Sequence, residues 1–151
     1  VQLSIDGIGA RYEYIRYPAS WTQLQENLTK YLQINQLNFR LSVSHTVSAY
    51  NIYYLDEFFT WCYNVGLPRP WLGRVHNPQP MRPGVWSGLA KTEIVNKLKT
   101  SEHFDVRVWA NLINSVDESE FFEEFKIKLE KHDQYRNTNF KGTFPELAKY
   151  L

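Results

Sequence analysis

The sequence has little cysteine, little net charge and no long apolar run, and each shortage excludes a class of protein. Its one cysteine, Cys62, cannot form an intramolecular disulfide framework, which favours a reducing compartment. A single thiolate is also too few to hold an iron–sulfur cluster. No stretch approaches the ~20 apolar residues of a membrane span and no signal peptide is visible, so we expect a cytoplasmic protein without a membrane partner.

Other familiar site types are missing as well. The net charge is +1, which provides no concentrated basic face for nucleic acid. The histidines lack the HxxxH spacing of a zinc site, and no GxSxG, GxGxxG or GxxxxGK[ST] motif occurs. What the chain does have is 151 residues with 43% hydrophobic and 16% aromatic side chains, enough for one domain with a real core.

The first half of the chain alternates strand and helix patterns. Apolar and polar residues alternate with a period of two in the strand candidates, whereas the helix candidates carry apolar residues three and four positions apart. Ser20 is expected to cap a helix of about a dozen residues, and Asn35 to end it. The remaining elements predicted here are a strand over 1–5, a strand over 37–47, a helix over 52–65 and a strand over 71–75.

The second half is predicted to be helical. Residues 76–84 contain three prolines and are expected to be irregular, because proline cannot donate a backbone hydrogen bond. Helices are predicted over 87–98, 104–113 and 118–135, with a final turn over 144–147. Asp117 is expected to cap the third helix, and Glu118 to be a solvated or capping residue at its start. The pattern indicates an α/β fold of two or three parallel strands with helices, followed by a helical C-terminal region.

Several short motifs occur in a definite order along this chain. They are Ser4-Ile5-Asp6-Gly7, Glu13-Tyr14, Arg16, Ser20-Trp21, Glu26-Asn27-Leu28, the segment VSHTVSAYNIYYL at 43–55 and the segment DQYRNTNFKGTFPEL at 133–147. In this order they resemble the later part of radical S-adenosylmethionine (radical SAM) enzymes, especially members with a SPASM or shortened twitch C-terminal region. The resemblance covers most of the chain.

The resemblance implies a fold, a cofactor and a set of contacts. Residues 1–87 would be the C-terminal portion of a partial TIM-like (β/α) barrel, and residues 88–151 a twitch-like helical extension. Ser4, Asp6, Arg16 and Asn51 would lie beside S-adenosylmethionine at the carboxyl ends of the strands. The parent enzyme would cleave this cofactor to a radical that abstracts hydrogen from a peptide or small-molecule substrate.

The family's CxxxCxxC motif, which holds a [4Fe–4S] cluster, lies upstream of the strand that starts this chain. The chain also begins at Val1, inside a predicted strand and without an initiator methionine. We therefore expect a fragment whose partner is the missing N-terminal half of the parent, with no cluster ligands and no activity of its own.

Each candidate residue also has a structural interpretation. Asp6 with Gly7 is a common turn pair, and Arg16 could form an ion pair with Glu13 or stack on tyrosine rings. His45 shares a strand face with apolar residues, which favours a core or rim histidine. Asn51 has the propensity of a helix cap.

A second hypothesis for the whole chain is a binding or interaction module without a cluster. A sheet that starts at Val1 would have an open edge, and open edges recruit other strands. This hypothesis predicts self-association or pairing with a partner that buries Trp21, Trp61 or Trp71. Cys62 is expected to be buried in an aromatic-rich helix.

Overall fold

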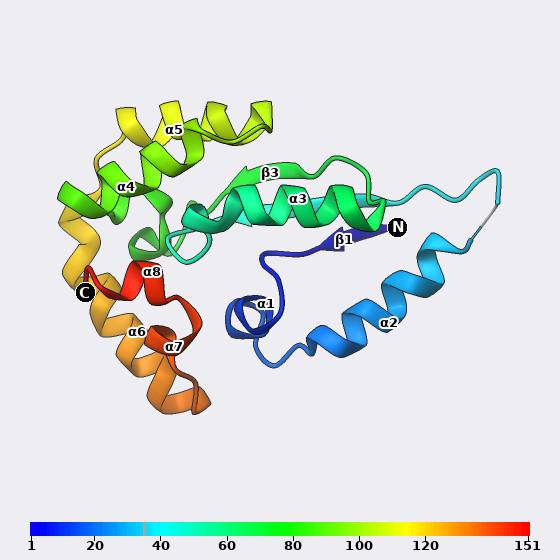
Figure 1. The fold of residues 1–151 in the computed structure, drawn as a ribbon. Coiled ribbons are helices and arrows are strands. Elements are labelled where there is room, and N and C mark those ends of the chain that lie inside the picture. The colour runs from blue at the N-terminus through cyan, green and yellow to red at the C-terminus, as the bar shows by residue number, and fades with distance from the viewer. Residues whose placement is uncertain (35) are drawn as a thin grey trace.

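Three parallel strands form an open sheet in the computed structural model, which describes residues 1–34 and 36–151. They are β1 (Gln2–Ser4), β2 (Ser42–Val47) and β3 (Trp71–Arg74), and their order in the sheet follows the chain, β1-β2-β3 (Figure 1). Ser4 pairs with Ser44, and Ser44 pairs in turn with Trp71. The predicted α/β fold with parallel strands is confirmed.

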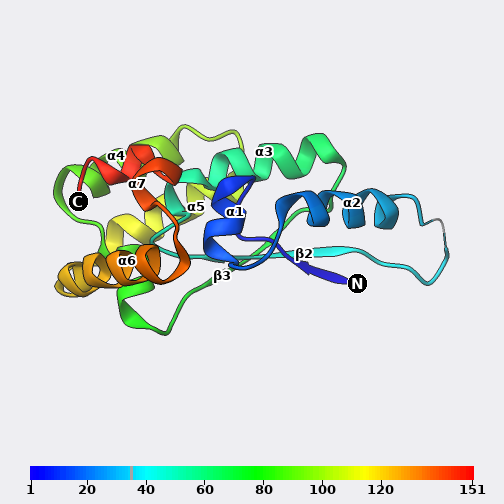
Figure 2. The same cartoon turned by 90° about the horizontal axis from the view of Figure 1, so that it is seen from below.

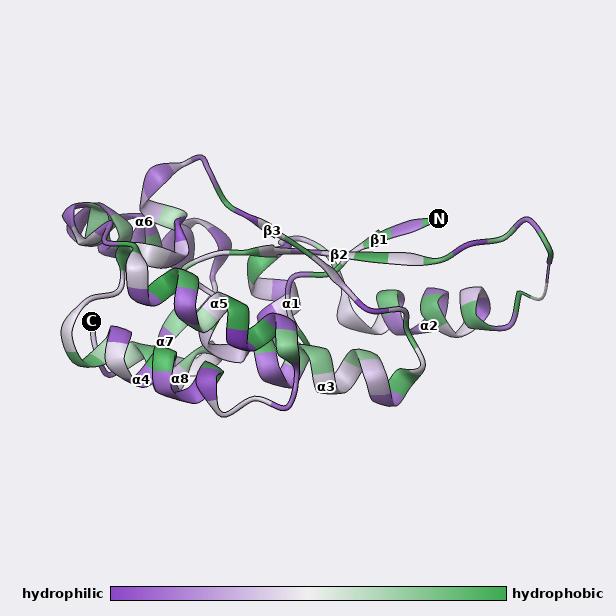
Figure 3. Ribbon diagram, turned by 90° about the horizontal axis from the view of Figure 1, so that it is seen from above, coloured by the Kyte–Doolittle hydropathy of each residue, from purple (hydrophilic) through white to green (hydrophobic). Residues whose placement is uncertain are grey.

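The connecting helices lie on one side of this sheet. Helices α1 (Ala10–Ile15) and α2 (Trp21–Leu32) join β1 to β2, and the 3-10 turn η1 (Ile52–Tyr54) with α3 (Leu55–Val65) joins β2 to β3. Figures 2 and 3 both show α1, α2 and α3 on the same face of the strands. In a (β/α) barrel, the strands follow one another in chain order and all the helices lie on one face of the sheet. In a doubly wound sheet, helices cover both faces.

The two faces of the sheet differ in chemistry. The helix-covered face carries apolar side chains such as Val43 and Val47, which are 2% and 0% exposed. The opposite face carries Ser4, Ser44 and Thr46, whose residues are exposed or half-buried. We call this second side the hydroxyl face; none of the helices between the strands covers it (Figure 3).

The C-terminal region is a group of helices beyond the carboxyl ends of the strands (Figure 1). Its elements, after the short 3-10 turns η2 (Gln79–Met81) and η3 (Pro83–Val85), are α4 (Gly88–Lys99), α5 (Phe104–Ser115), η4 (Ser119–Phe121), α6 (Phe122–Arg136), α7 (Phe140–Thr143) and α8 (Pro145–Ala148). The predicted helical C-terminal region is therefore confirmed.

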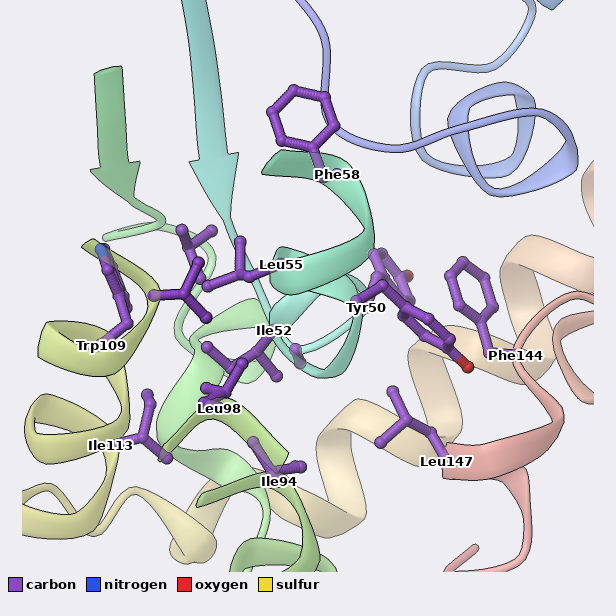
Figure 4. Packing of buried hydrophobic residues seen from close by; sticks show 14 of the residues in the cluster. Tyr50, Ile52, Leu55, Phe58, Ile94, Leu98, Trp109, Ile113, Phe144 and Leu147 are labelled. Atoms are coloured by element: carbon purple, nitrogen blue, oxygen red, sulfur yellow. The ribbon is translucent and has the colours of Figure 1, made fainter. Parts of the chain in front are cut away.

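A continuous core joins the sheet-bearing half to these helices (Figure 4). The Tyr14 ring meets Phe144 edge-on with centroids 5.2 Å apart, and Tyr50 stacks on Phe144 at 6.0 Å. Ile52 of η1 and Leu55 at the start of α3 are fully buried, as are Ile94 and Leu98 of α4. Residues on both sides of the predicted boundary at 87/88 thus share one core, and the boundary itself remains a prediction.

The ends of the elements follow local chemistry. The Ser20 hydroxyl accepts a hydrogen bond from the Gln23 N–H at 3.3 Å, which confirms it as the cap of α2. Gly66 ends α3 with φ 81°, a left-handed conformation that glycine adopts without strain. The predicted helix end at Asn35 lies outside the described residues.

One predicted strand start was wrong, and two short helices were not predicted. Strand β2 begins at Ser42 rather than at 37, because the strand pairing starts at Gln2 with Ser42 and no described strand lies beside residues 37–41. The short helices α1 and α7 were not predicted, since neither spans two full turns of a periodic pattern. Among the described helices, none has the length and hydropathy that a membrane crossing requires.

Candidate functional site

Asp6 is the centre of a polar cluster at the carboxyl ends of β1 and β2. Asp6 lies two residues after the end of β1, and its side chain is only 7% exposed. One carboxylate oxygen, Oδ2, accepts a hydrogen bond from Arg16 Nε at 2.6 Å, and the other, Oδ1, accepts the Thr46 N–H at 2.6 Å. Asp6 therefore continues the pairing of β1 with β2 through its side chain after the backbone ladder has ended.

Asn51 joins the same cluster from the other side. Its Nδ2 donates to the main-chain oxygens of Asp6 at 3.0 Å and Thr46 at 2.9 Å, while its Oδ1 accepts the Ser48 N–H at 2.7 Å. It begins the 3-10 turn η1 but makes no capping bond to it. Asn51 thus occupies the cap position that its propensity suggested, but its amide makes no capping bond and hydrogen-bonds to the ends of two strands instead.

Arg16 has a different partner from the one that sequence spacing suggested. Glu13 accepts the Trp21 N–H at 2.8 Å, at the start of α2, so it does not pair with Arg16. Arg16 reaches back to Asp6, ten positions earlier, and its side chain remains 36% exposed. In the described part of the chain, only its Nε makes a hydrogen bond, so its terminal N–H groups can meet a ligand.

Ser4 lies on the hydroxyl face two residues before Asp6. Its Oγ is 3.1 Å from Ser44 Oγ across the strand pair. The structure thus brings Arg16 and Asn51 each into a hydrogen bond with Asp6, while the Ser4 hydroxyl, at the end of β1, meets Ser44 instead. We call Asp6, Arg16, Asn51 and the Thr46 backbone the strand-end node.

His45 lies behind this node, between the sheet and α3. It is 1% exposed and its ring packs on Phe58 with centroids 4.2 Å apart. Burial lowers the pKa of His45 to about 4, although the nearby Asp6 carboxylate acts in the opposite direction. His45 is a neutral core residue at neutral pH, as its place on the apolar face predicted.

The end of β3 carries a second polar cluster that sequence reasoning missed. Glu118 was predicted to be solvated or capping, but it is 7% exposed and pairs with Arg74 and Arg82. Its N–H donates to the Gly84 carbonyl at 3.1 Å. Asp117 accepts the Ser119 N–H at 3.0 Å, but it is not the cap of the third helix as expected, because α6 begins at Phe122 and Phe121 precedes it. Because Arg74 and Glu118 are 44 positions apart, no local pattern could have revealed the pair.

An iron–sulfur cluster does not fit the residues of this chain. Cys62 is 1% exposed, and burial raises the pKa of its thiol to about 12, so it stays protonated. No group of three or more metal-ligating side chains gathers anywhere within residues 1–34 and 36–151. A cluster in contact with this chain would need ligands from another polypeptide segment.

Comparison of the chain with protein-family models, with curated proteins and with solved structures finds no match.

Proposed function

We propose that this chain forms later strands and the helical cap of a radical SAM-type barrel, and that its strand-end node contributes to binding S-adenosylmethionine. One observation carries the proposal. A polar node stands at the carboxyl ends of parallel strands that run in chain order with helices on one face. Barrel enzymes bind their ligands at this end of the strands. The family resemblance supports the same location for the cofactor.

The residues of the node would have separate roles. Arg16, whose terminal N–H groups make no hydrogen bond to the described residues, would bind the carboxylate of the cofactor. The Ser4 hydroxyl, on the hydroxyl face, would meet its sugar hydroxyls. Asp6 and Asn51 have their side-chain atoms committed to protein partners, so they would position Arg16 and the strand ends rather than grip the ligand themselves. S-adenosylmethionine, reduced by one electron from a cluster on the other half of the parent, would supply the radical that abstracts hydrogen from the substrate.

The proposal requires a partner for the chemistry. The [4Fe–4S] cluster would be held by a cysteine-bearing N-terminal half, consistent with the lack of fit in this chain. That half would also supply further strands and enclose the hydroxyl face, since parallel sheets are normally covered on both sides. The substrate, a peptide or another small molecule, would lie in the space so enclosed.

Calorimetric titration of this protein with S-adenosylmethionine tests the proposal. We expect weak binding that falls at least tenfold in Arg16→Gln, and less in Ser4→Ala. The matched control is Arg69→Gln, which removes an exposed arginine that pairs with Asp105 far from the node. Absence of binding at millimolar cofactor, or equal affinity of Arg16→Gln and the wild type, would contradict the proposal.

A second candidate function is an interaction module that pairs through an open sheet edge. Within the described residues, β1 pairs with β2 alone and β3 pairs with β2 alone, so each has an outer edge without a strand. Unpaired edge groups can accept another strand. This module would self-associate or bind a partner without any cofactor.

A further inference from the structure

The imidazole of His45 is held in one tautomer. Its Nδ1 lies 2.8 Å from the main-chain oxygen of Ile5. A carbonyl oxygen can only accept, so Nδ1 must carry the proton and donate. In the neutral ring, Nε2 is then a bare acceptor that needs a donor.

No described residue supplies that donor. Nε2 is buried and has no hydrogen-bond partner within residues 1–34 and 36–151. Leaving a buried acceptor unsatisfied costs roughly 1–3 kcal/mol, which is why such atoms are rare in folded proteins. His45 is 1% exposed, so bulk solvent does not satisfy it either.

A small cavity lies next to this ring. Its volume is about 10 Å³, and it is bounded by Gly7 and Ile8 of the turn after β1, by Arg11 of α1, and by Asn51 and Tyr54. His45 and Phe58 complete the lining. The cavity therefore lies beneath the turn that carries the chain away from Asp6.

We propose that this cavity is the binding site of one internal water molecule, which donates a hydrogen bond to His45 Nε2. The volume is close to that of a single water probe and excludes any organic ligand. A cation of similar size, such as ammonium, is disfavoured because Arg11 lines the same space. The Arg11 guanidinium donates to Glu57, so His45 Nε2 is the partner that the structure assigns to this water.

This water would lie between His45 of β2 and the Gly7–Ile8 turn, which lines the other side of the cavity together with Arg11 of α1. In the described structure, the His45 side chain makes one hydrogen bond, from Nδ1 to the Ile5 carbonyl, and its Nε2 makes none. The water is thus a positioning element for the turn that follows Asp6. The inference does not depend on the proposed cofactor.

Water-to-protein cross-relaxation in the NMR spectrum of the labelled protein tests the proposal. We expect a long-lived water to give cross-peaks to the ring protons of Phe58 and Tyr54, and to lose them in His45→Phe, which keeps an aromatic side chain but has no acceptor nitrogen. The control is His103→Phe, the same change at a histidine outside the cavity, which should leave the cross-peaks in place. A dry cavity in the wild type, or cross-peaks that persist in His45→Phe, would overturn the proposal.

If His45→Phe does not fold, the ¹⁵N chemical shift of Nε2 in the native protein decides instead. A hydrogen-bonded acceptor nitrogen resonates upfield of a bare one. An upfield shift supports the water, and the shift of a bare nitrogen rejects it.

Discussion

At the residue scale, a few buried polar atoms hold the strand ends together. Asp6 replaces the missing backbone partner of Thr46, and Asn51 ties the main chains of both residues. Bonds from N–H groups to a buried carboxylate are stronger than neutral ones, roughly 1.5–3 kcal/mol each. The node is therefore a rigid base from which the exposed end of Arg16 can extend.

His45 makes stability depend on acidity. Its pKa falls from 6.5 to about 4 on folding, so the unfolded chain takes up the proton first as the pH is lowered. Stability is fully present above pH 6.5 and is lost as the pH falls toward 4, by roughly 3 kcal/mol from this group. Denaturant unfolding between pH 7 and pH 4 should show this loss in the wild type and a smaller one in His45→Phe. In the control Val43→Ala, on the same strand face, total stability should fall but the pH slope should not change; equal slopes in all three proteins would refute the assignment.

At the element scale, two serines that precede helices allow a matched comparison. Ser20 bonds to the Gln23 N–H at the start of α2, whereas Ser87 precedes α4 without any side-chain capping bond. Ser20→Ala should therefore lower the free energy of unfolding by about 1 kcal/mol, and Ser87→Ala by much less. Urea denaturation measures both. If the two variants lose equal stability, the capping bond at Ser20 is not significant.

Gly84 is where the end of β3 meets the C-terminal helices. A Cβ at this position would lie 2.5 Å from Glu118 Oε2, too close for any real contact. Gly84→Ala should push Glu118 away from Arg74 and Arg82 and cost roughly 1–3 kcal/mol. Gly142→Ala is the control, because its Cβ would meet nothing closer than 3.4 Å. The same change should cost less in a Glu118→Ala background; an unchanged cost there would show that the clash lies elsewhere.

How much of this could be predicted from sequence depends on the range of the interactions. The presence of the three strands, the cap at Ser20 and the helix end at residue 65 depend on neighbours a few residues away, and those predictions are confirmed. The Asp6–Arg16 pair and the role of Asn51 depend on how β1 and β2 are placed side by side, so propensity suggested a turn and a cap instead. The burial and ion pairs of Glu118 depend on how the helical region packs against the end of β3, and this packing produces no periodic pattern in the sequence. The assignment of these residues to a cofactor stays a prediction.

At the scale of the whole molecule, the open edge of β1 can be tested without disturbing the sheet. The Val1 carbonyl accepts the Ser42 N–H and the Ile5 N–H donates to Ser44, so the odd-numbered residues bond to β2. The N–H of Gln2 then points to the open side, because successive residues of a strand alternate.

If the chain pairs through this edge, its mass in sedimentation should rise with concentration. Gln2→Pro, which removes the outward donor, should abolish the rise, and Gln2→Ala should leave it intact. A monomer at every concentration would count against the interaction module.

The central claim is that the strand-end node is a cofactor site, and mapping S-adenosylmethionine onto the isotope-labelled protein by NMR tests it most directly. The account predicts that titration shifts the Thr46 amide, the Arg16 Nε–H and the amides of Ser4 and Ser44, while the Arg69 side chain stays unchanged. Shifts confined to other surfaces, such as the pocket of about 380 Å³ beside Phe59 and Phe104, would contradict it, as would no shift at all.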